Sequence, residues 1–203
     1  MSICMFTQEN FNDFLDRLDK SLRDLPRERC LAFGAACCER ALENYVSFFK
    51  STGQGSPTVL KEVLDRVWEH VQGAQIGSGE LELVRASVKH ALLDNSEQES
   101  FEGAAAQEGC LCFRLLVDAV AEENCSQSVL RISSMLRDTT DMLVQQSLGI
   151  DATDPQLEEK IASHSMMIDE LKRQRRYLDQ LSSPNQETSL EQFRRSVQRI
   201  HPN

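Results

Sequence analysis

Apolar residues recur along this chain at the three- and four-residue spacing of α-helices. Residues 59–71 show this most clearly, because valine, leucine and tryptophan return there every three or four positions. Alternating apolar and polar runs of strand length are absent from the sequence, and clusters of β-branched residues are rare. The pattern therefore predicts an all-α protein.

Local signals place the ends of eight predicted helices. The residue before a proline disfavours helical backbone, a proline suits the first turn of a helix, and a glycine often follows the last turn. The predicted helices span about residues 7–25, 26–52, 56–73, 79–93, 104–123, 126–149, 154–183 and 189–200. We expect a compact bundle of seven to eight helices, in a single domain over residues 1–203 with a soft seam near the polar segment 94–102.

The predicted helix over residues 26–52 carries apolar residues on two faces. One face holds Cys30, Phe33, Cys37, Ala41 and Phe48, and the other holds Leu31, Cys38, Leu42, Tyr45 and Phe49. A helix that is apolar on two sides is usually central in a bundle. Gly34 lies between these faces and allows a neighbouring helix to approach closely.

Charge and apolar content narrow the classes of partner. Acidic residues outnumber basic residues by 32 to 22, which gives a net charge of −10. Nonspecific nucleic-acid binding needs basic surface, so we expect no nucleic-acid partner, whereas a basic protein partner suits this balance. No stretch approaches the ~18 apolar residues of a membrane span, so we expect no membrane association.

The N-terminus and the cysteines indicate a compartment. Residues 1–7 lack the basic region and apolar core of a signal peptide. The seven cysteines are odd in number and form no C-x-x-C pair. We therefore expect a cytoplasmic protein whose cysteines are thiols packed like small apolar residues.

Motifs that carry chemistry are missing from the sequence. The four histidines are scattered, none follows a glutamate by three positions, and H-E-x-x-H does not occur. The nucleophile motif G-x-S-x-G and the glycine-rich nucleotide loops are absent as well. The sequence therefore predicts no catalytic residue, no cofactor and no metal site.

The polar residues that are the best candidates for a site lie on the second and third predicted helices. Asp65 and Glu69 are four positions apart and share a helix face, as do Arg40 and Asn44. If these helices form a hairpin, Arg40 reaches Asp65 or Glu69. Two interpretations stay open: a partly buried ion pair that fixes the helix register, and a polar pocket in which Arg40 holds an anion. The candidate polar site comprises Glu39, Arg40, Asn44, Thr52, Gly53, Gly55, Asp65, Trp68 and Glu69.

Residues 38–69 resemble a known family. The residues that carry the resemblance are Cys38-Glu39-Arg40, Asn44-Tyr45, Phe48, Thr52-Gly53-x-Gly55, Leu64-Asp65 and Trp68-Glu69. This pattern is similar to the YjaG-like family of bacterial proteins, also called domain of unknown function 416. The resemblance implies a small, cytosolic, all-α bacterial protein, and it implies no activity and no catalytic residues.

We consider two hypotheses of function, which belong to different classes of protein. The leading one is a non-enzymatic protein-interaction module, one form of which is an immunity-type protein that binds a basic toxin domain. The alternative is an enzyme or small-ligand binder that uses a polar pocket between the second and third helices. A homodimer formed through an exposed apolar stripe of the last helix is a further hypothesis.

Overall fold

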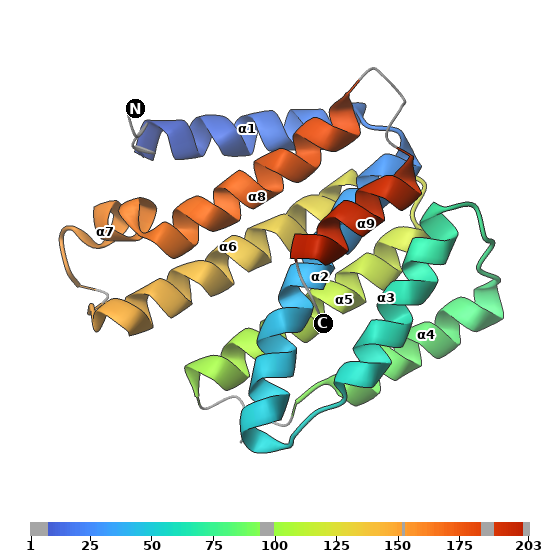
Figure 1. Cartoon of the computed structure of the whole chain (residues 1–203), viewed down its shortest axis with the longest axis horizontal. Helices are drawn as coiled ribbons and strands as arrows, with labels where there is room; N and C mark the ends of the chain where they lie inside the picture. The colour runs from blue at the N-terminus through green and yellow to red at the C-terminus, as the bar shows by residue number, and fades with distance from the viewer. Residues whose placement is uncertain (1–7, 94–99, 152, 184–188, 201–203) are drawn as a thin grey trace.

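Nine α-helices and no strand make up the part of the chain that the computed structural model describes, residues 8–93, 100–151, 153–183 and 189–200 (Figure 1). The all-α prediction is confirmed. The helices are α1 (Gln8–Asp24), α2 (Arg27–Thr52), α3 (Pro57–Val71), α4 (Ser78–Ala91), α5 (Phe101–Ala121), α6 (Ser126–Leu148), α7 (Leu157–Ser163), α8 (Ser165–Ser182) and α9 (Leu190–Ile200). Within the described residues, no helix has both the length and the apolar character needed to cross a bilayer.

Helix α2 is central, as its two apolar faces predict. It packs against α3, α5, α6, α8 and α9, and every residue from 30 to 39 is buried. Phe49, which the pattern assigns to an inner face, lies near the end of α2 and is exposed. Helices α1, α6, α7 and α8 lie on one side of α2, and α3 and α4 lie on the other side (Figure 1).

Small residues set how closely the central helices approach. A Cβ atom added to Gly109 of α5 would lie 3.0 Å from the carbonyl oxygen of Ala41 in α2. A Cβ atom added to Gly34 of α2 would lie 3.1 Å from Cγ2 of Val129 in α6. The close approach expected at Gly34 is therefore present, and Gly109 provides a second one that brings the α5 and α2 backbones together.

The differences from the predicted helices are clearest at His164 and at the start of α5. The predicted helix over 154–183 is two helices, because the backbone at His164 is extended and its Nδ1 accepts a hydrogen bond from the Met166 amide at 3.3 Å, which caps α8. Helix α5 begins three residues earlier than predicted, since the Ser100 hydroxyl caps it by accepting from the Gly103 amide at 3.0 Å. The expected cap Thr7 and most of the expected seam, residues 94–99, lie outside the described residues.

The described cysteines are six buried free thiols. Burial raises the pKa of Cys110 to about 12, and it raises the pKa of Cys112 further. Because the reactive form of cysteine is the thiolate, Cys110 and Cys112 act as packing groups at neutral pH.

Candidate functional site

The turn between α2 and α3 contains three residues of the predicted polar site. The Thr52 hydroxyl donates to the Phe48 carbonyl oxygen at 2.9 Å and accepts from the Gln54 amide at 3.1 Å. Gly53 ends α2 with a left-handed backbone (φ 75°), and its amide donates to the Phe49 carbonyl oxygen at 2.7 Å. Thr52 and Gly53 therefore act as a helix cap.

Gly55 completes the turn against a buried tyrosine. The Tyr45 hydroxyl accepts from the Ser56 amide at 2.9 Å and donates to the carbonyl oxygen of Ala91 at 2.6 Å. This one hydroxyl links α2, the turn and the last residue of α4. Gly55 has φ 98°, and a Cβ atom there would lie 2.5 Å from the Tyr45 hydroxyl oxygen. The position therefore requires glycine both for its backbone and for space.

Gly55→Ala should lower the free energy of unfolding by about 2–3 kcal/mol, because it adds left-handed strain and displaces the buried Tyr45 hydroxyl. Urea denaturation measures the loss. Gly53→Ala has the same kind of backbone strain but open space around it, so it should lower the free energy of unfolding by less than Gly55→Ala does. Gly77→Ala has neither feature and serves as the control. Equal losses for the three variants would contradict the role of Gly55 as a spacer.

Glu39 and Trp68 join α2 to α3 inside the bundle. The Trp68 indole nitrogen donates to Glu39 Oε1 at 3.1 Å, and both side chains are buried. A buried carboxylate is stabilised when it accepts such a hydrogen bond. These two residues of the predicted site are therefore in direct contact.

Asp65 and Trp68 also hold the last helix. Asp65 forms an ion pair with Arg194 of α9, and the Arg194 guanidinium lies 5.7 Å from the centre of the Trp68 ring. Phe193 of α9 meets Trp68 and Tyr177 edge to face, with ring centres 6.1 and 5.9 Å apart. Asp65 and Trp68 of the predicted site therefore contact α9, which packs mainly against α2.

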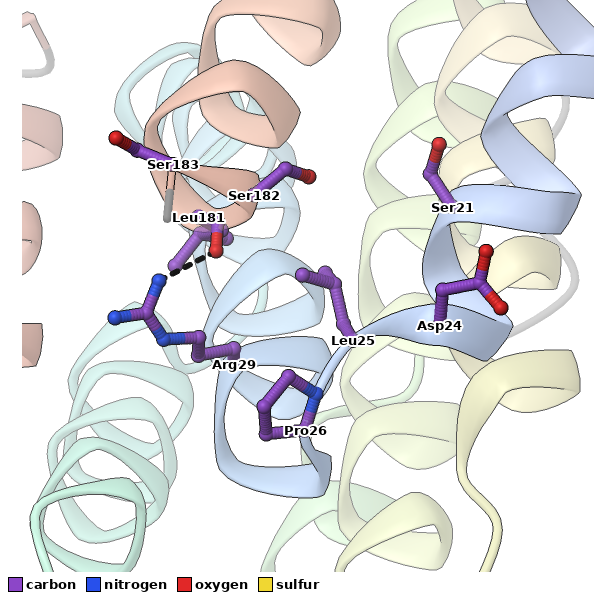
Figure 2. A pocket seen from close by; sticks show the side chains of 8 residues that line it. All are labelled: Ser21, Asp24, Leu25, Pro26, Arg29, Leu181, Ser182 and Ser183. Atoms are coloured by element: carbon purple, nitrogen blue, oxygen red, sulfur yellow. Dashed lines mark hydrogen bonds between the residues drawn. The ribbon is translucent and has the colours of Figure 1, made fainter. Parts of the chain in front are cut away.

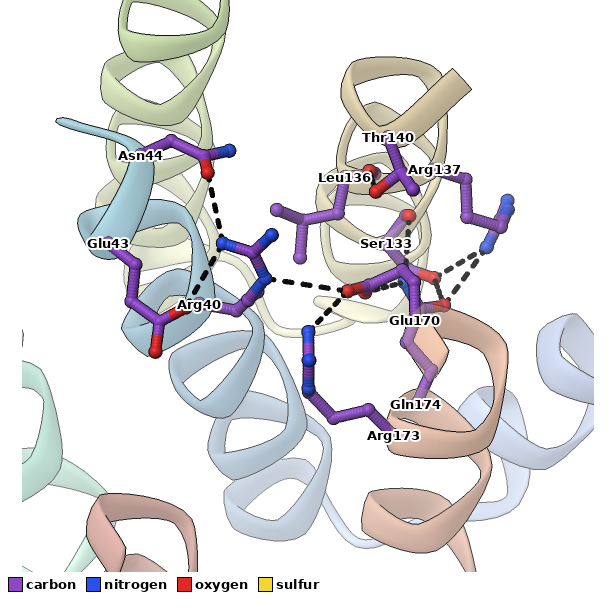
Figure 3. Close-up of polar contacts among 10 residues, drawn as sticks. All are labelled: Arg40, Glu43, Asn44, Ser133, Leu136, Arg137, Thr140, Glu170, Arg173 and Gln174. Atoms are coloured by element: carbon purple, nitrogen blue, oxygen red, sulfur yellow. Dashed lines mark hydrogen bonds and ion pairs between the residues drawn. The ribbon is translucent and has the colours of Figure 1, made fainter. Parts of the chain in front are cut away.

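Arg40 faces a different helix from the one expected. Its Nη1 donates to Asn44 at 3.0 Å and to Glu43 at 3.1 Å, and its Nε lies 3.8 Å from Glu170 of α8 (Figure 3). Successive residues of a helix point about 100° apart, so Glu39 reaches α3 while Arg40 reaches α8. This corrects the expected contact of Arg40 with Asp65 or Glu69. Glu69 pairs instead with Arg66 at 3.0 Å.

Glu170 is the centre of a polar network that the sequence did not reveal. Only 2% of this residue is exposed, and its carboxylate accepts from Arg173 at 2.6 Å and from Gln174 at 2.8 Å (Figure 3). Together with Arg40, these contacts surround one buried carboxylate with two guanidinium groups and one amide. The anion that Arg40 meets is therefore a side chain of the same protein.

The same network extends into α6 through Arg137. This buried guanidinium donates to Ser133 at 2.8 Å, to Gln174 at 3.1 Å and to Ser134 at 2.8 Å. Burial lowers the pKa of Arg137. The network joins α2, α6 and α8. Hydroxyl and amide groups of the chain accept hydrogen bonds from Arg137, whereas the buried Nε of Arg40 has the ion-pair contact with Glu170 and no hydrogen bond.

Four surface hollows between described residues lie away from the predicted site. The one drawn in Figure 2 has a volume of about 370 Å³ and lies where the ends of α1 and α8 meet the start of α2. Arg29 at its edge donates to the Leu181 carbonyl oxygen at 2.6 Å, which completes the C-terminal end of α8. None of the four hollows is lined by a residue of the predicted polar site.

The described residues contain no group of three or more histidine, cysteine, aspartate or glutamate side chains placed to hold a metal ion. The fold and the site define an all-α protein in which residues of the predicted polar site join α2 to α3 and α8, and join α3 to α9. The chain belongs to the DUF416 family, because the family described as "Protein of unknown function (DUF416)" matches residues 17–200. The resemblance seen in residues 38–69 is thereby confirmed.

A solved structure supports the same fold. A DUF416 family protein from Shewanella baltica OS155 matches with a TM-score of 0.77 at 19% sequence identity, over 90% of this chain and 93% of that one. None of the curated proteins compared with this chain matches it. The comparisons therefore give the family and the fold.

Proposed function

We propose that this protein is a non-enzymatic interaction module that binds a basic protein partner in the cytoplasm. The observation that carries the proposal is the surface where α6 ends and α7 begins, which combines the exposed Leu148 and the half-buried Ile150 with exposed carboxylates. We call this surface, formed by residues 148–151 and 158–165, the α6–α7 corner.

The corner has a hollow of about 490 Å³ that is lined by two apolar and four polar residues. Leu148 and Ile150 line it together with residues of α7 and the first residue of α8, and Leu148 is 45% exposed. Exposed apolar side chains beside a hollow are a common feature of protein docking surfaces. An apolar side chain of a partner fits this hollow.

Two carboxylates lie close in sequence to residues that line the hollow. Asp151 directly follows Ile150, and Glu159 lies four residues before Ser163, which places it on the same face of α7 as that lining residue. Hydrogen bonds from the Thr153 amide and hydroxyl lower the pKa of Asp151, so it is charged at neutral pH. Lys160 is already paired with Asp154 at 2.8 Å. The matching partner surface is a basic segment with an apolar anchor, and the net charge of −10 favours rapid encounter with it.

The experiment is a capture assay with variants of the corner. A triple variant, Asp151→Asn with Glu158→Gln and Glu159→Gln, removes three exposed carboxylates at the corner. A matched variant, Asp16→Asn with Glu62→Gln and Glu123→Gln, removes three exposed carboxylates elsewhere. Immobilised wild-type protein and the matched variant should capture a protein of basic isoelectric point from a lysate of the source cells, and the corner variant should lose it. No captured basic protein, or equal loss with both variants, would refute the proposal.

The immunity-type form of this proposal adds that the basic partner is a toxin domain. It predicts that the captured partner is encoded beside this chain's gene. The hypothesis of a ligand pocket between α2 and α3 has less support, because Arg40 and Asp65 each pair with a different helix. Homodimerisation stays a prediction, and the apolar side chains Phe193 and Val197 of α9 are buried in the bundle.

A further inference from the structure

A groove between α4 and α5 combines cations with apolar surface. Its volume is about 520 Å³, and it is lined by five residues of α4, by Leu92 directly after α4, and by Arg114 and Asp118 of α5. A volume of this size is typical of small-molecule sites. The groove lies on α4 and α5, apart from the α6–α7 corner, so the two proposals stand independently.

Of the three cations that line the groove, only Arg85 pairs with the carboxylates of the lining. Arg85 takes both carboxylates, since its Nε donates to Asp118 at 2.9 Å and its Nη1 donates to Glu82 at 2.5 Å. The other two cations are Lys89 and Arg114, and within the described residues neither forms an ion pair or a side-chain hydrogen bond. The lining therefore has three cations against two carboxylates, in a chain of net charge −10.

Apolar side chains line the same groove between these cations. Val88 is buried, Leu92 is half-buried, and the methyl group of Ala86 is exposed. A ligand in the groove therefore meets hydrocarbon as well as positive charge. Its apolar part buries more of the surface of Val88 and Leu92, and its anionic part forms ion pairs with Lys89 and Arg114.

We propose that this groove binds a phosphate monoester carried on a small apolar group. A phosphate monoester carries a charge of about −2 at neutral pH, which matches the charges of Lys89 and Arg114. Arginine binds phosphate oxygens through two parallel hydrogen bonds, and lysine adds a compact charge. The apolar group contacts the hydrocarbon surface of Val88 and Leu92.

The test is an NMR titration of the full chain with phenyl phosphate. Saturable shifts are expected in the amides of residues 85–92 and 114–118. Inorganic phosphate, which has the charge without the ring, and phenol, which has the ring without the charge, should each bind about tenfold more weakly or worse. Shifts centred elsewhere, or equal affinity for inorganic phosphate, would overturn the proposal.

Paired variants separate this site from general charge effects. Lys89→Gln with Arg114→Gln should weaken phenyl phosphate binding by about tenfold or more, because charged hydrogen bonds are lost. Lys61→Gln with Arg131→Gln removes two exposed cations of α3 and α6 that do not line the groove, and it should bind like the wild type. Circular dichroism shows that each variant is folded. An equal loss in both pairs, or no loss in the first pair, would refute a specific site.

Discussion

Replacing Trp68 with alanine should lower the free energy of unfolding by about 3–5 kcal/mol. Trp68 is fully buried, donates to Glu39, and carries Arg194 and Phe193 of α9 against its ring. The substitution therefore opens a cavity, removes a hydrogen bond from a buried carboxylate and weakens the docking of α9. Trp68 is the only tryptophan, so urea unfolding is followed by far-ultraviolet circular dichroism rather than by fluorescence.

Two further variants separate the contributions of Trp68. Trp68→Phe keeps an aromatic ring beside Phe193 but lacks the indole N–H. It should therefore lower the free energy of unfolding by less than Trp68→Ala does. Leu83→Ala truncates a side chain that is 70% exposed and should change stability by about 0.5 kcal/mol or less. If Trp68→Ala cost no more than Leu83→Ala, the contacts of Trp68 with Glu39 and with α9 would not stabilise the fold.

Helix positions could be predicted from the sequence because helical periodicity is a local property. Helix α3 was expected over residues 56–73 and occupies Pro57–Val71, where the serine and proline at its start and the glycine after its end give strong local signals. The central place of α2 also followed from its own residues, since apolar side chains on two faces need neighbours on both. The break at His164 was not predicted because it depends on one side-chain cap.

Contacts between helices were harder to predict than the helices themselves. The pattern selected Glu39 and Trp68, which do meet, but it paired Arg40 with the wrong helix. Adjacent residues of α2 point to different neighbours, and sequence alone does not say which neighbour lies where. The partner of Asp65 is Arg194, which lies 129 residues later in the chain and had no visible relation to it.

The network around Glu170 left a signal in the sequence that only the structure explains. Glu170 and Gln174 fall among the apolar residues Met167, Leu171 and Leu178 of α8, at positions that face the core. Polar residues at core-facing positions indicate either a partner across the interface or a functional group. The partners are on α2 and α6, and the distance along the chain concealed them.

Replacing Glu170 with alanine should lower the free energy of unfolding by about 3 kcal/mol. Removing one member of a buried ion pair leaves the remaining charges without compensation. Here Arg40 and Arg173 pair with Glu170, and Arg137 donates to Gln174, which itself donates to Glu170. Arg40 and Arg173 retain 17% and 21% side-chain exposure, so water offsets part of the loss. Urea denaturation of Glu170→Ala measures it, with the exposed neighbour Asp169→Ala as the matched control.

A combined variant shows whether charge compensation is the cause. Replacing Glu170, Arg40 and Arg173 together with methionine removes the charges of the ion pairs at once, so its loss should be smaller than the sum of the three single losses. Additive losses would mean that the three side chains stabilise the fold independently. A loss for Glu170→Ala no larger than that for Asp169→Ala would show that α2 and α8 are held by apolar packing alone.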